Sequence, residues 1–117
     1  MTVPGRRQTR LQDQIREELT EMIELELKDP RIGFTNVTHV DLRPDLRTAH
    51  IWVSVKGETG VQVGTLDGLR SATGYLRHEL GLRLRLRRVP ELIFALDHSA
   101  EDMLRIESLL AQANKNR

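Results

Sequence analysis

"LRSATGYLRHELGLRLRLRRVP", residues 69–90, carries the strongest structural signals in the chain. Its leucines recur at the three- and four-residue spacing of a helix, and the stripe that begins at Leu66 continues to Leu84. Gly74 lies inside this stripe, where a glycine costs about 1 kcal/mol relative to alanine. We therefore expect a helical segment over residues 62–85. Either this segment bends near Gly74, or Gly74 lets another backbone come close.

The same stretch concentrates positive charge. The chain as a whole is nearly balanced, with 18 Lys and Arg against 17 Asp and Glu, but this stretch has one acid, Glu79. Its arginines are Arg70, Arg77, Arg83, Arg85, Arg87 and Arg88. Exposed surfaces usually mix both signs of charge, so the pattern favours contact with a polyanion. A solvated face on a half-buried element is the alternative, because Leu and Arg alternate over residues 82–87.

Arg70 and Arg77 lie on either side of Gly74 on a helical projection. If the helix breaks there, the second segment begins with free N–H groups and the positive end of its dipole, an arrangement that suits a phosphate. The alternative is a solvated arginine face and a helix that the glycine merely breaks. The start of the chain is expected to be flexible and contains Arg6, Arg7 and Arg10. It is either a basic arm that lies along a nucleic-acid backbone or a frayed terminus.

The rest of the chain predicts one α+β domain over residues 1–117, with about 6–110 ordered and short flexible termini. Its other elements are a helix over 8–27, strands over 36–43, 48–56 and 91–97, and a last helix that opens at Ser99. These give a three-stranded sheet with helices packed on one face. The last helix should bury a face that is made of Met103, Ile106, Leu109 and Leu110. Trp52, on the outward face of its strand, should be covered by a terminal segment; stacking on a nucleic-acid base is the alternative.

Several classes of protein are excluded or disfavoured. The absence of cysteine excludes disulfides and thiolate metal sites, and it suits a reducing cytoplasm. No run approaches the roughly 18 apolar residues of a membrane-spanning helix. The four histidines are scattered over different elements, and no phosphate-binding loop or nucleophile motif is present. We therefore expect no enzyme, no metal site and no cofactor.

Five segments, in this order along the chain, resemble the bacterial ribosome-binding factor A family. They are "KDPRIGF" (28–34), "AHIWVSV" (49–55), "SATGYLRHEL" (71–80), "RLRLRRVPELIFALDHS" (83–99) and "RIESLL" (105–110). The resemblance implies a type II KH-like domain in which an A-x-G bend, here Ala72-Thr73-Gly74, replaces the usual G-x-x-G loop. It implies a non-catalytic cytoplasmic factor, here expected to be a monomer, that binds the free small (30S) ribosomal subunit and its ribosomal RNA.

Family members support late maturation of that subunit, including processing of its RNA, and growth in the cold. Ribosomal proteins are further expected partners, and no membrane is. The resemblance and the charge pattern together give these candidate RNA-binding residues: Arg6, Arg7, Arg10, Arg70, Ala72, Thr73, Gly74, Arg77, Arg83, Arg85, Arg87 and Arg88. A protein–protein module whose basic face docks an acidic partner remains the alternative.

Overall fold

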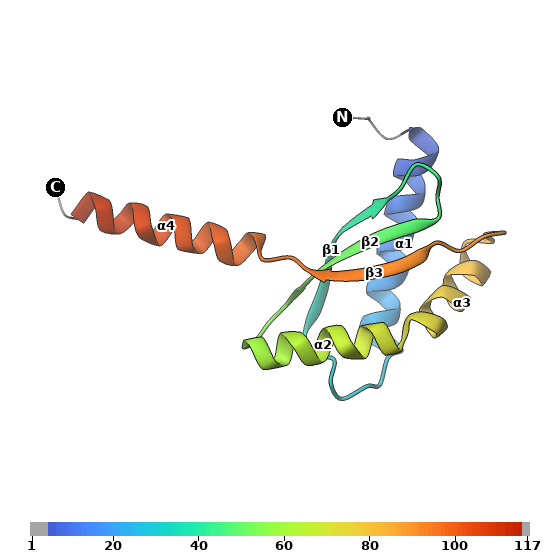
Figure 1. The fold of residues 1–117 in the computed structure, drawn as a ribbon, viewed down its shortest axis with the longest axis horizontal. Helices are drawn as coiled ribbons and strands as arrows, with labels where there is room; N and C mark the ends of the chain where they lie inside the picture. Colours follow the sequence, from blue (N-terminus) through green and yellow to red (C-terminus); the bar gives the residue numbers. More distant parts are fainter. Residues whose placement is uncertain (1–4, 116–117) are drawn as a thin grey trace.

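The computed structural model describes residues 5–115 of the 117-residue chain. It contains a three-stranded sheet and helices in the order α-β-β-α-α-β-α, which confirms the α+β class (Figure 1). The elements are α1 (Arg6–Leu25), β1 (Thr35–Leu42), β2 (Thr48–Val55), α2 (Thr59–Ser71), α3 (Thr73–Arg83), β3 (Glu91–Leu96) and α4 (Ser99–Lys115). The expected element boundaries were correct to within about three residues.

The strands lie in the order β1-β2-β3, with β1 antiparallel and β3 parallel to β2. The parallel pairing requires a crossover, which α2 and α3 supply. Strand β2 alternates as its sequence predicts: Ala49, Ile51 and Val53 are fully buried. In β1 the buried residues Val37 and Val40 are three apart, because a bulge shifts the register between Val37 and His39.

Helices α1, α2 and α3 cover the buried face of the sheet (Figure 1). Four residues of α1, spaced as one helical face, enter the core: Ile15, Leu19, Met22 and Ile23. Leu69 of α2 and Leu76 and Leu80 of α3 are fully buried beside them. This packing fixes the start of α1 and the end of α3 relative to the sheet.

The expected bend lies at Ala72, two residues before Gly74. Ala72 has φ −90° and ψ 0° and separates the last residue of α2 from the first of α3. The Oγ1 of Thr73 donates a hydrogen bond of 2.9 Å to the carbonyl oxygen of Arg70 across the junction. The helix-bend-helix arrangement is therefore present.

Two expectations about the ends of the chain are wrong. Arg6, Arg7 and Arg10 do not lie in a flexible arm, because α1 begins at Arg6. The last helix forms where the sequence predicts, but it does not pack on the domain: α4 projects away from it (Figure 1). The large apolar side chains of α4 are 52–67% exposed. An apolar stripe shows that a helix has a face to bury, but it does not say which surface will cover that face.

The link into α4 is fixed by hydrogen bonds. The Oδ2 of Asp97 accepts a bond of 2.6 Å from the Thr38 hydroxyl, and its Oδ1 accepts one of 2.9 Å from the N–H of Ser99. In the first turn of α4, Glu101 accepts a bond of 3.2 Å from Gln62 of α2. Trp52 is 37% exposed, so α4 does not cover it as a terminal segment was expected to.

Candidate nucleic-acid interface

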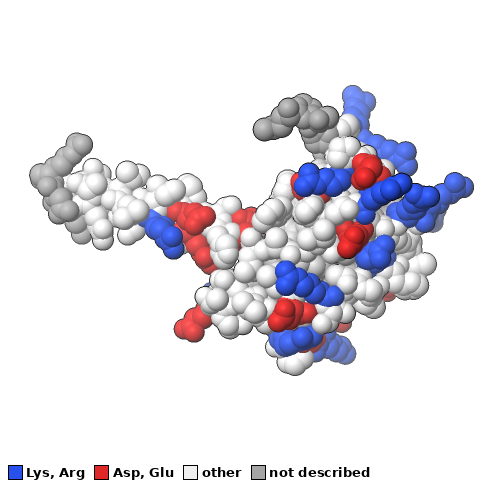
Figure 2. Space-filling model, viewed as in Figure 1, with Lys and Arg blue, Asp and Glu red and all other residues white. Residues whose placement is uncertain are grey.

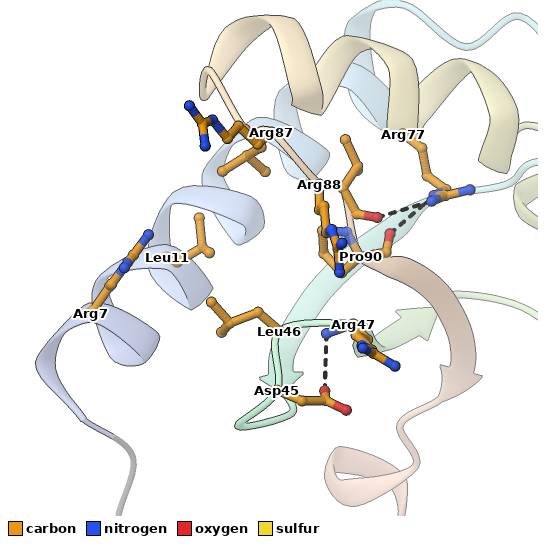
Figure 3. A pocket seen from close by; sticks show the side chains of 11 residues that line it. Arg7, Leu11, Asp45, Leu46, Arg47, Arg77, Arg87, Arg88 and Pro90 are labelled. Carbon is orange, nitrogen blue, oxygen red and sulfur yellow. Dashed lines mark hydrogen bonds between the residues drawn. The ribbon is translucent and has the colours of Figure 1, made fainter.

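A basic pocket of about 580 Å³ lies where three segments meet (Figure 3). These segments are the start of α1, the turn between β1 and β2, and the segment between α3 and β3. Five arginines line the pocket: Arg7, Arg47, Arg77, Arg87 and Arg88. Asp45 is the one acid among the lining residues. Figure 2 shows Lys and Arg side chains gathered on this end of the molecule.

The segment between α3 and β3 is held in place by a specific helix ending. Leu86 donates its N–H to the carbonyl oxygen of Gly81 at 3.0 Å, and Arg85 has φ 53°, in the left-handed region. This is the six-to-one bond of a Schellman motif, with an arginine at the position that usually holds glycine. The reversal turns the chain back toward α3, where a Cβ on Gly81 would lie 2.9 Å from Cγ2 of Val89. Arg87 and Arg88 are thereby brought to the pocket.

Arg77 positions the same segment from α3. Its Nε donates a hydrogen bond of 3.1 Å to the carbonyl oxygen of Pro90, and its Nη2 donates one of 2.9 Å to that of Val89 (Figure 3). Pro90 is buried, so Arg77 satisfies a carbonyl at the entry to β3. Arg77 lies one helical turn after Gly74, and it therefore joins the pocket to the bend.

The other segments of the pocket are also fixed. Gln12 of α1 accepts the N–H of Leu42 at 2.9 Å, and Gln8 donates to the carbonyl oxygen of the same residue. These bonds fasten the start of α1, and hence Arg7, to the end of β1. In the turn between β1 and β2, Asp45 accepts the N–H of Arg47 at 3.0 Å.

The pocket arginines differ in their partners. Within residues 5–115, the side chains of Arg7, Arg47, Arg87 and Arg88 form no hydrogen bond or salt bridge. Four unpaired guanidiniums around one depression produce a positive potential that is not neutralised inside the protein. Such a surface suits a polyanion, since each guanidinium can bind phosphate oxygens through two parallel N–H groups.

Arg83 has a different environment from the one expected. It lies 2.6 Å from Glu26, 3.4 Å from Glu18 and 3.6 Å from Glu79. The hydrogen bond from Arg83, followed by one from the Tyr75 hydroxyl, lowers the pKa of Glu26 below its usual 4.5. Arg83 is therefore not part of an unneutralised basic run, because α1 and its C-cap residue bring two distant carboxylates to it.

The bend has an open surface. A Cβ added to Gly74 would meet no heavy atom within 4 Å, and Gly74 does not have a positive φ. Arg70 is exposed on the preceding turn, and the N-terminus of α3 has no side-chain cap. The backbone at Gly74 can therefore be approached closely from outside.

The structure places the candidate residues in four groups. Arg7, Arg77, Arg87 and Arg88 line the pocket, while Arg70 and Ala72-Thr73-Gly74 form the bend. Arg6, Arg10 and Arg85 are exposed near the pocket segments without lining the pocket, and Arg83 is paired with carboxylates. Arg47 was missed by the sequence reasoning. The signal was present in "RPDLR" (43–47), because a turn that joins two strands presents its flanking charges at one end of the sheet.

Other kinds of site find no support in the described part of the chain. Residues 5–115 contain no group of three or more His, Asp or Glu side chains that could hold a metal ion. None of the helices described is long and apolar enough to cross a membrane.

Comparisons with known proteins agree on one family. The family described as Ribosome-binding factor A matches residues 7–110. A protein of that name from Natranaerobius thermophilus is 46% identical over 110 residues, which cover 94% of this chain and 84% of the relative. One from Caldanaerobacter subterraneus subsp. tengcongensis is 42% identical over 110 residues, covering 93% and 90%.

Solved structures give the same result. The crystal structure of ribosome-binding factor A from Thermus thermophilus is 31% identical, with a TM-score of 0.68, covering 76% of this chain and 94% of that one. A homology model of Thermus thermophilus ribosome binding factor A, as fitted into the cryo-EM map of its complex with 30S, has a TM-score of 0.65 at 31% identity. That similarity covers 76% of this chain and 93% of the other.

Proposed function

Because the chain belongs to the ribosome-binding factor A family, we propose that it binds the free small (30S) ribosomal subunit through ribosomal RNA. The observation that carries the proposal is the basic pocket with four unpaired arginines beside an open helix bend. A relative of 31% identity that has been fitted into a map of a 30S complex supports the same partner.

In this proposal phosphates of the RNA backbone contact Arg7, Arg47, Arg87 and Arg88, and the chain of phosphates continues over Gly74 past Arg70. Arg6, Arg10 and Arg85 add positive charge around this path. Arg77 and Arg83 act mainly by holding the segments in place. Contacts to phosphate position a protein without reading base sequence. The site is therefore selected by the shape of folded RNA or by neighbouring ribosomal proteins.

The proposal extends to the biological role. The chain acts in the cytoplasm as a non-catalytic assembly factor that supports late maturation of the small subunit, including processing of its RNA, and growth in the cold. These finer statements rest on the family resemblance and not on the geometry of the pocket.

Co-sedimentation tests the proposal. The protein is centrifuged with free small subunits, with joined ribosomes and with naked small-subunit ribosomal RNA. We expect it to travel with free small subunits and to bind the naked RNA less tightly as salt is raised. Binding to the subunit without any binding to naked RNA would favour the alternative, in which the basic face docks an acidic protein. No binding to free subunits would overturn the proposal.

A further inference from the structure

The charges of α1 run against its helix dipole. A helix is stabilised by acids in its first turn and by bases in its last turn. Helix α1 begins with Arg6 and Arg7, has no acid in its first turn and has no base in its last turn. Its second half is acidic instead. This arrangement does not stabilise the helix, so the two ends need another explanation. The basic end lines the basic pocket through Arg7, and the acidic end lines a second depression.

This second depression, the apolar groove, has a volume of about 500 Å³. It lies between the second half of α1 and the segment that leads into β1. Ile23 and Leu27 line it from α1 and the residues just after it, and Ile32 and Phe34 line it from the segment. Glu24 stands at its α1 wall. The ring of Phe34 is 86% exposed, which is the largest exposure among the large hydrophobic residues described.

Phe34 is exposed on a rigid segment. The carbonyl oxygen of Phe34 accepts the N–H of Lys56 at 3.0 Å, and the N–H of Gly33 donates to Oγ1 of Thr65 at 3.1 Å. Thr65 is fully buried. Ile32 packs so closely on α2 that a Cβ on Gly68 would lie 2.6 Å from its Cγ1. A large apolar ring that is exposed to solvent beside a groove is typical of a contact residue. Because its segment is already fixed, little conformational entropy is lost when a partner binds.

The stripe of α1 that reaches the groove at Glu24 is acidic, and we call this stripe the rim. Glu17, Glu21 and Glu24 are exposed and recur at the spacing of one helical stripe. In the part of the chain that the structure describes, none of the three forms a salt bridge. The neighbouring Glu18 and Glu26 are the ones that pair with Arg83. The rim therefore presents unpaired negative charge beside an apolar surface.

We infer that the apolar groove docks a cationic polypeptide segment that carries apolar side chains. The apolar side chains of the partner pack on Phe34, Ile23 and Leu27, while its Lys or Arg side chains pair with the carboxylates of the rim. Three unpaired carboxylates repel a phosphate backbone, so the charge argues against a nucleic acid as the occupant. The inference uses no residue of the basic pocket, and it therefore stands or falls separately from the proposed function.

The test measures binding of fluorescent peptides of about 12 residues to the full chain by anisotropy. The probes are a Lys/Leu peptide, a Lys/Ser peptide, a Glu/Leu peptide and an oligouridylate of similar length. We expect the Lys/Leu peptide to bind at least about tenfold more tightly than the other two peptides, because only it supplies both charge and apolar contact. Phe34→Ser should weaken that binding by about tenfold or more. Leu25→Ser is the matched control, since Leu25 is 69% exposed on α1 and does not line the groove.

A second pair of variants tests the charge. Glu17→Gln, Glu21→Gln and Glu24→Gln together should weaken the Lys/Leu peptide and reduce its dependence on salt. Glu58→Gln, Glu91→Gln and Glu107→Gln together change the net charge equally at exposed sites elsewhere, and they should have little effect. Equal losses in the two triple variants would overturn the inference, as would unchanged binding in Phe34→Ser. Oligouridylate binding that Phe34→Ser abolishes would show that the groove takes a nucleobase instead.

Discussion

The Nη2 of Arg83 lies 2.6 Å from Oε1 of Glu26, and this contact joins α3 to the end of α1. Glu18 of α1 and Glu79 of α3 complete a ring of carboxylates around the same guanidinium. Four residues later in the chain, Arg87 faces the basic pocket without any such partner. The arginines of residues 69–90 therefore have two roles. Some form contacts that stabilise the fold, and others present positive charge at the surface.

Arg83→Ala should lower the melting temperature, because it removes the contact between helices and leaves Glu18, Glu26 and Glu79 close to one another. The pKa of Glu26 is lowered in the folded protein, chiefly by Arg83. The matching stability is present above the unfolded pKa of about 4.5 and is lost as pH falls through the folded pKa. Melting curves between neutral pH and about pH 3 should show this acid loss in the wild type and a smaller one in Arg83→Ala. Arg105→Ala, an exposed arginine on α4, is the control. Equal melting temperatures for the two variants would show that the carboxylates around Arg83 do not stabilise the fold.

Gly68→Ala should destabilise the protein. The new Cβ would stand 2.6 Å from Cγ1 of Ile32, a branched side chain with little freedom to move. Overpacking of this kind costs about 1–3 kcal/mol, which exceeds the gain of about 1 kcal/mol from the better helix former.

Gly64→Ala provides the comparison within α2, because its Cβ would meet nothing closer than the carbonyl oxygen of Arg31 at 3.7 Å. Chemical denaturation should place Gly64→Ala at or above the wild type and Gly68→Ala below it. If Gly68→Ala matched Gly64→Ala, then the close packing of residues 29–34 on α2 would not contribute to stability.

Gly74→Ala should weaken binding to the small subunit while the fold is kept or stabilised by up to about 1 kcal/mol. The residue has no positive φ, and its Cβ would point into open space, so the folded protein has no reason to resist the change. Gly60→Ala is a closely matched control: Gly60 is also the second residue of its helix, and its Cβ would also meet nothing within 4 Å. Affinity is measured by co-sedimentation, with a melting curve for each variant. Equal affinities for the two variants would mean that no RNA backbone approaches the bend.

The hydrogen bonds of Asp97 at the entry to α4 should weaken in acid. Hydrogen bonds from the Ser99 side chain, from Thr38 and from the Ser99 backbone hold the pKa of Asp97 at about 2, below its usual 3.8. The stabilisation is therefore present above about pH 4 and is lost as pH falls toward 2. NMR titration of the Asp97 carboxyl should give the low pKa in the wild type and a value nearer to 3.8 in Thr38→Val. A carboxyl that titrates at its ordinary pKa in the wild type would show that these bonds do not persist in solution.

Much of the fold could be predicted from local patterns. The helical stripe from Leu66 to Leu84, interrupted by Gly74, is enough to predict a bent helix, because both signals are read within a few turns of chain. The alternation of Ala49, Ile51 and Val53 likewise predicts a strand with one buried face. These elements follow from the spacing of neighbouring residues and do not depend on distant parts of the chain.

The environment of individual charges could not be predicted in this way. Arg83 and Arg87 read alike in the sequence, and only the packing of α1 against α3 shows that one meets carboxylates 57 and 65 residues away. Arg47 enters the pocket because a β-turn brings it there. The link into α4 is held by a hydrogen bond between Asp97 and Thr38, which are also far apart along the chain.

Contact between the basic pocket and an RNA backbone can be measured through the salt dependence of binding to naked small-subunit ribosomal RNA. The variant combines Arg7→Ala, Arg47→Ala, Arg87→Ala and Arg88→Ala, none of which has a side-chain partner to lose within residues 5–115. Each phosphate contact contributes about 0.7–0.9 to the slope of log affinity against log salt. We expect the slope of the variant to be shallower than that of the wild type by about 3, with an unchanged melting temperature. A slope equal to that of the wild type would show that these four arginines do not contact the RNA backbone.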